Sequence, residues 1–284
     1  MRTGFSRATI ARAVAAGAVI RVCTGWVATS RASRTGITAV LAGGKLTGAS
    51  ALASRGTWDG LDRRIHVLLP PKGDGSDRHM LSPEAVFVAP RFPTTGLVRH
   101  WRNELFLDRT EPDWRASVID ALVLVGRTGS TEQFIACAES ALHERTMSLA
   151  ALPTFRAALP QRLRRYVDGL RSDSGSGLES IARLRFVTLG CRVEIQVEIP
   201  GIAPSGRDGA VDFLLDGWLV IEIDGDEYHD PVADRIRNSI LVRLGYRWHR
   251  FGYHQVLGDW DAVEATVREL LRYPPARMPR AHLG

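Results

Sequence analysis

The stretch A-V-D-F-L-L-D-G-W-L-V-I-E-I-D-G, residues 210–225, decides the fold of the second half of this chain. Two apolar strands, 210–215 and 218–223, surround an Asp-Gly pair, which is a strong hairpin signal. Asp212 and Glu222 lie inside these strands, where a charge is costly unless something binds it. The stretch therefore predicts a hairpin that holds a functional site.

The length of the hairpin loop decides whether the two acids face each other. A two-residue loop pairs Asp212 with Ile221, so that Asp212 and Glu222 lie on opposite faces of the sheet. A three-residue loop, 216–218, places Asp212 directly opposite Glu222. Asp224 follows Glu222 by two positions and shares its face. We expect the odd loop, with three carboxylates that repel one another unless they bind a divalent cation.

The flanking sequence completes an α/β domain in the order α-β-β-β-α-β. Its signals are 3.6-residue periodicity for helices, strict alternation for the first strand, and glycines that end helices. The expected elements are a helix over 178–189, a strand over 192–199, the hairpin, a helix over 232–244, a strand over 246–251 and a last helix over 260–271.

The first half of the chain predicts shorter helices and strands. A helix over 6–16 precedes a short hairpin over 19–28, and this helix-then-hairpin layout is typical of the end of a winged helix. The segment 172–177, S-D-S-G-S-G, has the composition of a linker. We therefore expect a winged-helix-like basic region over 1–70, a mixed loop and helical region over 71–171, the linker, and a second domain over 178–284.

Charge is distributed unevenly along the chain. Residues 1–65 contain ten Arg or Lys against two Asp or Glu, a net of +8, whereas residues 176–284 contain thirteen against sixteen, a net of −3. This basic front, residues 1–65, favours binding to a polyanion such as DNA. The arginine excess is also consistent with a GC-rich genome, since only Lys45 and Lys72 are lysines.

Composition narrows the class of protein. The chain has 284 residues, 45% hydrophobic and 24% charged, which excludes a disordered chain. No apolar stretch approaches the ~20 residues of a membrane-spanning helix, so no membrane partner is expected. The three cysteines are far apart and form no C-x-x-C pair, which favours a reducing cytoplasm.

Several motifs together resemble one family. They are V-D-F at 211–213, W-L-V-I-E-I-D-G at 218–225, His229, D-R-x-R-N at 234–238 and L-x-x-L-G-Y-R-W-x-R-F at 241–251. In this order they resemble the uncharacterised bacterial domain related to very short patch repair endonucleases, within the PD-(D/E)XK nuclease superfamily. The resemblance implies a restriction-endonuclease-like αβββαβ core with a mixed sheet, preceded here by the winged-helix-like and helical N-terminal region.

The resemblance also implies roles for particular residues. Asp212 matches the metal-binding aspartate of the superfamily, Glu222 its second acidic position, and Asp224 the position of the superfamily lysine. His229 matches a histidine near the scissile phosphate, and Glu179 matches a glutamate on the first helix. The implied catalytic residues are Glu179, Asp212, Glu222, Asp224 and His229, with Asp212, Glu222 and Asp224 as metal ligands. The missing lysine puts water activation in doubt, and the zinc ligands of the repair enzymes have no counterparts.

Simpler interpretations stand beside these roles. Glu179 completes the pattern Ser176-x-x-Glu179, so it also fits a capping box at the start of its helix. His229 also fits a surface loop, and Asp224 before a glycine also fits the end of a strand.

DNA contacts are expected on both halves. Arg12, Arg21 and Arg31 flank the N-terminal helix and hairpin, and the family resemblance adds Gln196, a glutamine typical of that domain. Arg235 and Arg237 fit a phosphate clamp, although such residues more often belong to a solvated helix face or to an ion pair that holds the fold. The stretches S-R-A-T-I-A-R-A-V-A-A-G-A-V-I-R-V-C-T-G-W at 6–26 and S-A-L-A-S-R-G-T-W at 50–58 loosely resemble type IV antitoxins of the abortive-infection kind.

These observations predict a cytoplasmic, metal-dependent DNA endonuclease or nickase that uses Mg²⁺, with Mn²⁺ as the alternative ion. The alternative is an antitoxin-like DNA-binding regulator whose nuclease fold is inert. The sequence leaves open a homodimer and a toxin–antitoxin or phage-defence setting.

Overall fold

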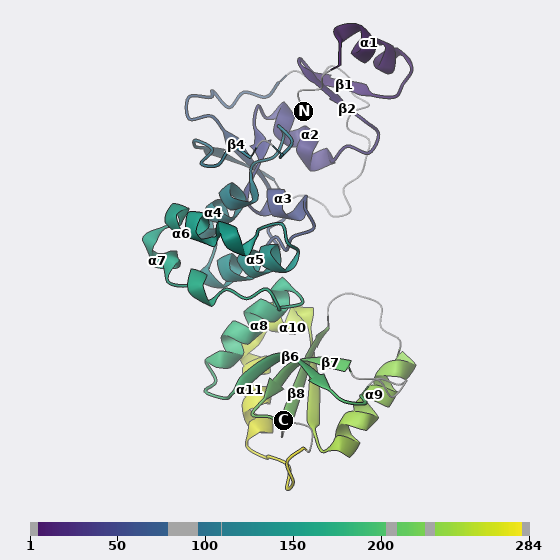
Figure 1. The fold of residues 1–284 in the computed structure, drawn as a ribbon, viewed down its shortest axis with the longest axis vertical. Coiled ribbons are helices and arrows are strands. Elements are labelled where there is room, and N and C mark those ends of the chain that lie inside the picture. Colours follow the sequence, from purple (N-terminus) through teal and green to yellow (C-terminus); the bar gives the residue numbers. More distant parts are fainter. Residues whose placement is uncertain (1–4, 79–95, 109, 203–208, 225–230, 280–284) are drawn as a thin grey trace. The chain divides into compact units, whose positions relative to one another are not determined.

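The computed structural model describes residues 5–78, 96–108, 110–202, 209–224 and 231–279. The chain is mixed α/β, as expected, and forms two compact units, unit 1 (Met1–Leu170) and unit 2 (Arg171–Gly284) (Figure 1). The boundary lies beside the Ser- and Gly-rich segment 172–177. Among the helices of the described residues, none has the length and apolar character needed to cross a bilayer.

Unit 1 begins with the expected helix and hairpin. Helix α1 (Arg7–Ala15) is capped by Ser6, whose side chain accepts a hydrogen bond from the Thr9 N–H. Strands β1 (Ile20–Cys23) and β2 (Trp26–Ala28) pair antiparallel, and α2 (Arg34–Leu41) packs on them through a small apolar cluster.

The remainder of unit 1 combines a small sheet with helices. Strands β3 and β4 pair antiparallel, β4 and β5 pair parallel, and α3 and α4 pack together. Strand β5 was not expected from the sequence, because the segment before it has loop composition. The elements are β3 (Lys45–Leu46), α3 (Gly48–Ala53), β4 (Ile65–Leu69), β5 (Leu97–Trp101), α4 (Val118–Thr128), α5 (Thr131–His143), η2 (Leu149–Ala151), α6 (Leu152–Ala158), α7 (Gln161–Arg164) and η3 (Val167–Gly169).

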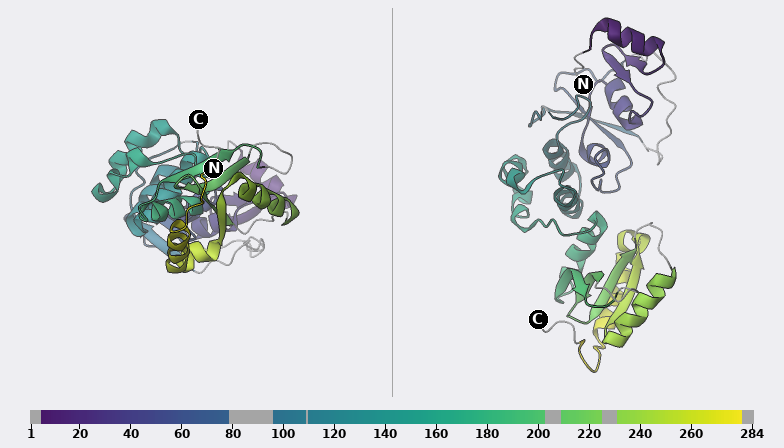
Figure 2. Two further views of the ribbon diagram at one scale, coloured as in Figure 1. Left: turned by 90° about the horizontal axis from the view of Figure 1, so that it is seen from below. Right: turned by 45° about the vertical axis from the view of Figure 1, so that its right-hand side comes forward.

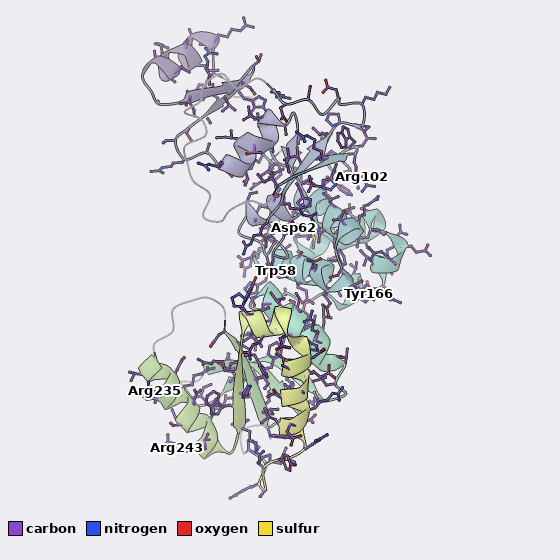
Figure 3. All side chains as sticks on the ribbon, turned by 180° about the vertical axis from the view of Figure 1, so that it is seen from behind. Trp58, Asp62, Arg102, Tyr166, Arg235 and Arg243 are labelled. Atoms are coloured by element: carbon purple, nitrogen blue, oxygen red, sulfur yellow. The ribbon has the colours of Figure 1, made fainter. Side chains whose placement is uncertain are left out.

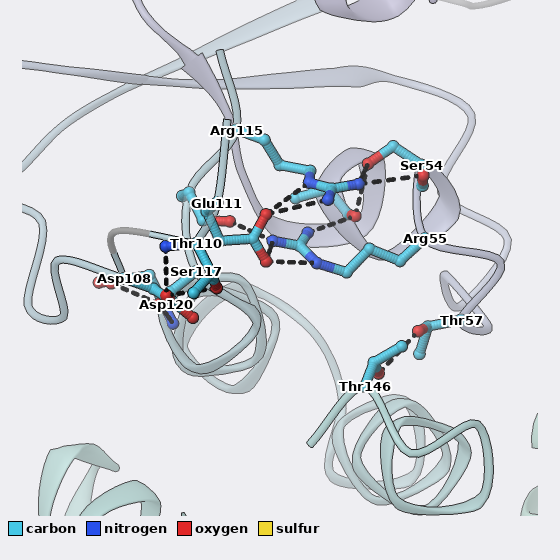
Figure 4. A network of polar contacts seen from close by, with 12 residues as sticks. Ser54, Arg55, Thr57, Asp108, Thr110, Glu111, Arg115, Ser117, Asp120 and Thr146 are labelled. Atoms are coloured by element: carbon cyan, nitrogen blue, oxygen red, sulfur yellow. Dashed lines mark hydrogen bonds and ion pairs between the residues drawn. The ribbon is translucent and has the colours of Figure 1, made fainter. Parts of the chain in front are cut away.

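A buried ion-pair network ties α3 to the segment before α4 (Figure 4). Arg55 Nη2 lies 2.6 Å from Glu111 Oε1, and Arg115 Nη2 lies 2.9 Å from Glu111 Oε2. Arg115 also donates to the Ser54 carbonyl at the end of α3. One carboxylate thus forms ion pairs with two arginines inside unit 1.

Unit 2 has the expected order α-β-β-β-α-β, followed by two helices. Its four-stranded sheet has the order β6-β7-β8-β9, in which only the β8–β9 pair is parallel. Helix α10, which connects β9 to the last helix, was not expected from the sequence. The elements are α8 (Gly177–Val187), β6 (Val193–Ile199), β7 (Gly209–Leu215), β8 (Leu219–Asp224), α9 (Pro231–Leu244), β9 (Arg247–Gly252), α10 (Tyr253–Gly258) and α11 (Trp260–Leu271).

Helices cover both faces of the unit 2 sheet (Figure 2). On one face α8, α10 and α11 bury a cluster that includes Phe186, Phe213 and Phe251. On the other face α9 covers a second cluster that includes Val220 and Leu241. The acidic residues of the hairpin lie at the end of this α9 face, beside an otherwise apolar core.

Candidate active site

The β7–β8 hairpin has the odd loop that the sequence predicts. Phe213 pairs with Ile221 and Leu215 with Leu219, so the loop is 216–218. Continuing this register by one position brings Asp212 opposite Glu222. The two strands touch there, because the Ile223 N–H donates to Asp212 Oδ2 at 2.8 Å. The hairpin therefore presents both acids on one face.

Asp212 holds its proton more tightly than an ordinary aspartate. Burial, followed by the nearby carboxylates of Glu179 and Glu222, raises the pKa of Asp212 to about 7, against the lowering effect of the Ile223 N–H and Arg237. A carboxyl group with this pKa is only partly ionised at neutral pH, and a nearby cation stabilises its ionised form. Such a perturbed group beside a second acid marks a candidate functional site.

Glu222 is buried, with 7% of its surface exposed. One carboxylate oxygen, Oε2, lies 2.6 Å from Arg237 Nη1 and 3.6 Å from Arg250 Nη2. The other oxygen, Oε1, is buried and has no hydrogen-bond partner among the described residues. An unsatisfied buried carboxylate oxygen is costly, by about 1–3 kcal/mol or more. It marks the point where a hard cation or a donor from substrate would be favourable.

Glu179 lies in the first turn of α8, and its carboxylate is near enough to Asp212 to act on it electrostatically. Its Oε2 accepts from the Gly175 N–H at 3.0 Å and from Gln196 Nε2 at 2.8 Å. The Ser176 side chain caps the helix by accepting from the Glu179 N–H. The glutamate side chain thus bonds to residues beyond the simple capping box that the pattern at 176–179 suggests, and it orients Gln196.

Gln196 has a strained backbone directly beside Asp212. Its φ is +48°, although it stands in the middle of β6. The β6–β7 ladder pairs Ile195 with Phe213 and Val197 with Val211, and the pair between them, Gln196 with Asp212, is missing. Positive φ at a non-glycine residue costs about 1–3 kcal/mol and is found preferentially at functional sites. Here the distortion interrupts the ladder beside the acid and turns the amide toward Glu179.

Asp224 shares the face of Glu222 and lies against Arg250, which also contacts Glu222. Its Oδ1 is 3.5 Å from Arg250 Nε, and Arg250 Nη1 in turn lies 2.6 Å from Asp234 Oδ2. In the part of the chain that is described, no three His, Cys, Asp or Glu side chains come together so that they could hold a metal ion. The metal-ligand roles of Asp212, Glu222 and Asp224 stay predictions.

Arg250 is a site residue that the sequence pattern does not predict. It stands beside Glu222 because β8 and β9 run parallel and pair Glu222 with Arg250. A charged residue in the motif R-W-H-R-F was the available signal, but the register of a parallel pair follows from the α9 crossover and is not encoded locally.

The other expected contacts are dispersed. Arg235 is exposed on α9 (Figure 3), whereas Arg237 of the same helix points at Glu222. Arg12 on α1, Arg21 on β1 and Arg31 after β2 are all exposed in unit 1. His229 lies outside the described residues.

The two interpretations of Arg237 predict different results for Arg237→Gln. Because Glu222 is buried, loss of its closest partner should lower the free energy of unfolding by about 2 kcal/mol, measured by urea denaturation. Arg243→Gln, an exposed change on the same helix, should stay within about 0.5 kcal/mol of the parent. Weaker DNA binding without any loss of stability would instead identify Arg237 as a phosphate contact.

Asp212 should make stability depend on pH. Its pKa of about 7 in the folded chain lies above the 3.8 of an ordinary aspartate. The ionised group therefore destabilises the fold by an amount that grows above pH ~4 and is complete above pH ~7. In metal-free buffer the thermal midpoint should fall more between pH 5 and 8 for the parent than for Asp212→Asn. Parallel curves for the two proteins would show that Asp212 titrates normally.

Comparison of the chain with family models, with curated proteins and with solved structures gives no match.

Proposed function

We propose that this is a cytoplasmic DNA-binding protein in which unit 2 is a Mg²⁺-dependent endonuclease or nickase with a PD-(D/E)XK-like core. The element order α8-β6-β7-β8-α9-β9 and the mixed four-stranded sheet are compatible with that core. Unit 1 would bind the duplex through a winged-helix-like front formed by α1, β1, β2 and α2.

One observation supports this proposal above the others. A buried glutamate, Glu222, has an unsatisfied oxygen, and the acid opposite it, Asp212, has a pKa of about 7. Two acids in apolar strands have few structural explanations, since each costs stability there. Mg²⁺ is commonly bound by one or two carboxylates together with water and substrate phosphates. The donor set thus fits a single Mg²⁺ held by Asp212 and Glu222.

The chain's own groups would then have distinct tasks. Mg²⁺, when bound, supplies Lewis-acid chemistry that neutralises charge on the phosphate and lowers the pKa of water. Asp212 and Glu222 hold the cation, and the buried surroundings strengthen that interaction. Glu179, fixed by Gly175 and Gln196, presents a carboxylate toward Asp212 that can position water. Arg237 and Arg250 contact Glu222 Oε2 and hold its side chain in place.

The direct test is cleavage of supercoiled plasmid. The purified chain is incubated with Mg²⁺, with Mn²⁺, with Ca²⁺ and with EDTA, and nicked and linear products are measured over time. We expect nicking with Mg²⁺ or Mn²⁺ and none with EDTA. Mg²⁺ should also raise the thermal midpoint of the parent at pH 8 by mass action. Absence of both effects would remove the basis for a metal-dependent enzyme.

A second candidate function rests on Arg237. Its guanidinium already sits 2.6 Å from Glu222 Oε2, which is the charge compensation that an inert site would need. We therefore keep the alternative of an antitoxin-like DNA-binding regulator whose nuclease fold only adds binding surface. It predicts duplex binding that is equal in Mg²⁺ and EDTA, with no cleavage.

A further inference from the structure

A cavity of about 310 Å³ lies in unit 1, and all the residues that line it belong to that unit. It opens between the β4–β5 sheet and α4, and its walls are mainly apolar, with Leu68, Val123, Leu124 and Leu105 among them. Its volume lies at the lower end of the range for small-molecule sites, which is about 300–1,000 Å³. A small, partly apolar ligand is therefore the class of occupant that it can take.

One face of α4 gives the cavity a charge gradient. Asp120, Val123, Leu124 and Arg127 all line it, which is the i, i+3, i+4, i+7 pattern of a single helix face. Seven residues along a helix correspond to about 10 Å, so Asp120 and Arg127 mark opposite ends. A ligand across this face meets an acid at one end, apolar side chains in the middle and a cation at the other.

The acidic end is fully engaged by the protein. Asp120 Oδ1 accepts from the Leu105 N–H at 2.8 Å, and Oδ2 accepts from the Phe106 N–H at 3.0 Å. Oδ2 also accepts from Ser117 Oγ at 2.9 Å (Figure 4). These bonds attach the segment after β5 to the start of α4. Asp120 is therefore part of the frame of the cavity.

The cationic end of the cavity has two arginines, Arg102 and Arg127. Arg102 (Figure 3) follows β5 and lines the cavity together with Arg127. Partial desolvation in the cavity, and then the nearby Arg127, lower the pKa of Arg102, whose side chain remains largely exposed. Within the described residues, neither arginine makes an ion pair, whereas Lys45, Arg55 and Arg115 of the same unit all do. Two like charges within electrostatic range gain most from a shared anion.

An aromatic side chain stands beside this pair. Trp101 lines the cavity, is 47% exposed, and is fixed in orientation because its Nε1–H donates to the Gly73 carbonyl at 2.9 Å. A rigid, accessible indole is a stacking platform for a planar ring.

From this arrangement we propose that the cavity binds a nucleotide 5′-phosphate, with the phosphate between Arg102 and Arg127 and the base against Trp101 and the apolar wall. A phosphate dianion matches two guanidinium groups, each of which can donate two hydrogen bonds. The apolar wall and the indole favour a nucleotide, whose phosphate is attached to a ring system, over inorganic phosphate. The source is either a free mononucleotide or the 5′ end of a DNA strand. This site is independent of the acids of unit 2.

The test is isothermal titration calorimetry on the full chain in EDTA. The probes are AMP, adenosine, inorganic phosphate, and an eight-nucleotide DNA strand with and without a 5′-phosphate. Tighter binding of AMP than of adenosine and phosphate supports the site with a free nucleotide as ligand. Tighter binding of the phosphorylated strand than of both AMP and the unphosphorylated strand supports it with a strand end as ligand. If AMP binds no tighter than adenosine, and the phosphorylated strand binds no tighter than the unphosphorylated strand, the proposal is overturned.

Variants separate this cavity from general basic attraction. Arg102→Gln and Arg127→Gln should each weaken the phosphate-dependent binding about tenfold or more. Arg165→Gln, an exposed arginine of the same unit, should leave it within about twofold. Both cavity arginines are exposed, so the variants should unfold at the same temperature as the parent. Equal weakening by all three changes, or by none, overturns the assignment to this cavity.

Discussion

Asp212→Asn should abolish Mg²⁺-dependent plasmid cleavage and leave the fold intact. Asparagine keeps the shape of the side chain and can still accept from the Ile223 N–H, but it lacks the charge that holds a divalent cation. Removal of one group that stabilises charge in a buried site costs about 100-fold or more in rate. The measurement is the initial rate of nicking at saturating Mg²⁺, with circular dichroism to verify the fold.

The matched control is Asp261→Asn, an exposed aspartate in the first turn of α11. It makes the same chemical change in the same unit, and cleavage should continue at the parental rate. Glu222→Gln should lose activity as Asp212→Asn does, because it removes the other ligand. If Asp212→Asn cleaves as fast as Asp261→Asn, the catalytic site lies elsewhere.

The geometry of the acidic hairpin follows from the sequence because strand periodicity permits few choices. Side chains alternate between faces, so two acids that share a site demand an odd loop, and the register Phe213↔Ile221 has it. The helices and strands around the hairpin also follow from local patterns. Alternation along 192–199 and the glycine after 232–244 are signals that a single segment contains.

The rest of the site depends on interactions that no local pattern records. Arg250 reaches Glu222 only because a helical crossover sets the parallel register of β9 on β8. The positive φ of Gln196 is a strained state that tertiary contacts impose on a residue in a strand. The pKa of Asp212 depends on burial and on Glu179, which lies far away in sequence. Composition alone could not supply any of these.

The contacts of the cavity in unit 1 also could not be predicted from local sequence patterns. Arg102 and Arg127 are twenty-five positions apart and belong to a loop and a helix, so their proximity depends on how α4 packs near β5. The basic front, by contrast, is visible in the sequence, because it rests on a count of charges over a continuous segment. Arg12, Arg21 and Arg31 of this front are exposed in the structure, so their contribution to DNA binding can be measured.

Simultaneous replacement of Arg12, Arg21 and Arg31 by Gln should weaken duplex binding and reduce its dependence on salt. All three side chains are exposed on the α1–β2 front of unit 1, so they are available to phosphates. Each neutralised phosphate adds about 0.9 to the magnitude of the slope of log affinity against log salt, so three contacts predict a loss of about 2.7. The measurement is fluorescence anisotropy with a labelled duplex over 50–300 mM salt in EDTA.

The control replaces three exposed arginines outside that front, Arg145, Arg165 and Arg277, by Gln. It removes the same net charge, so a purely nonspecific attraction by a protein of charge +6 should weaken equally in both triple variants. A front that contacts phosphates directly should instead lose slope only in the first variant, because counterion release depends on the charges at the interface. Equal slopes in the two variants would mean that the ten basic residues in the first 65 positions reflect composition alone, and that the duplex is bound by another surface.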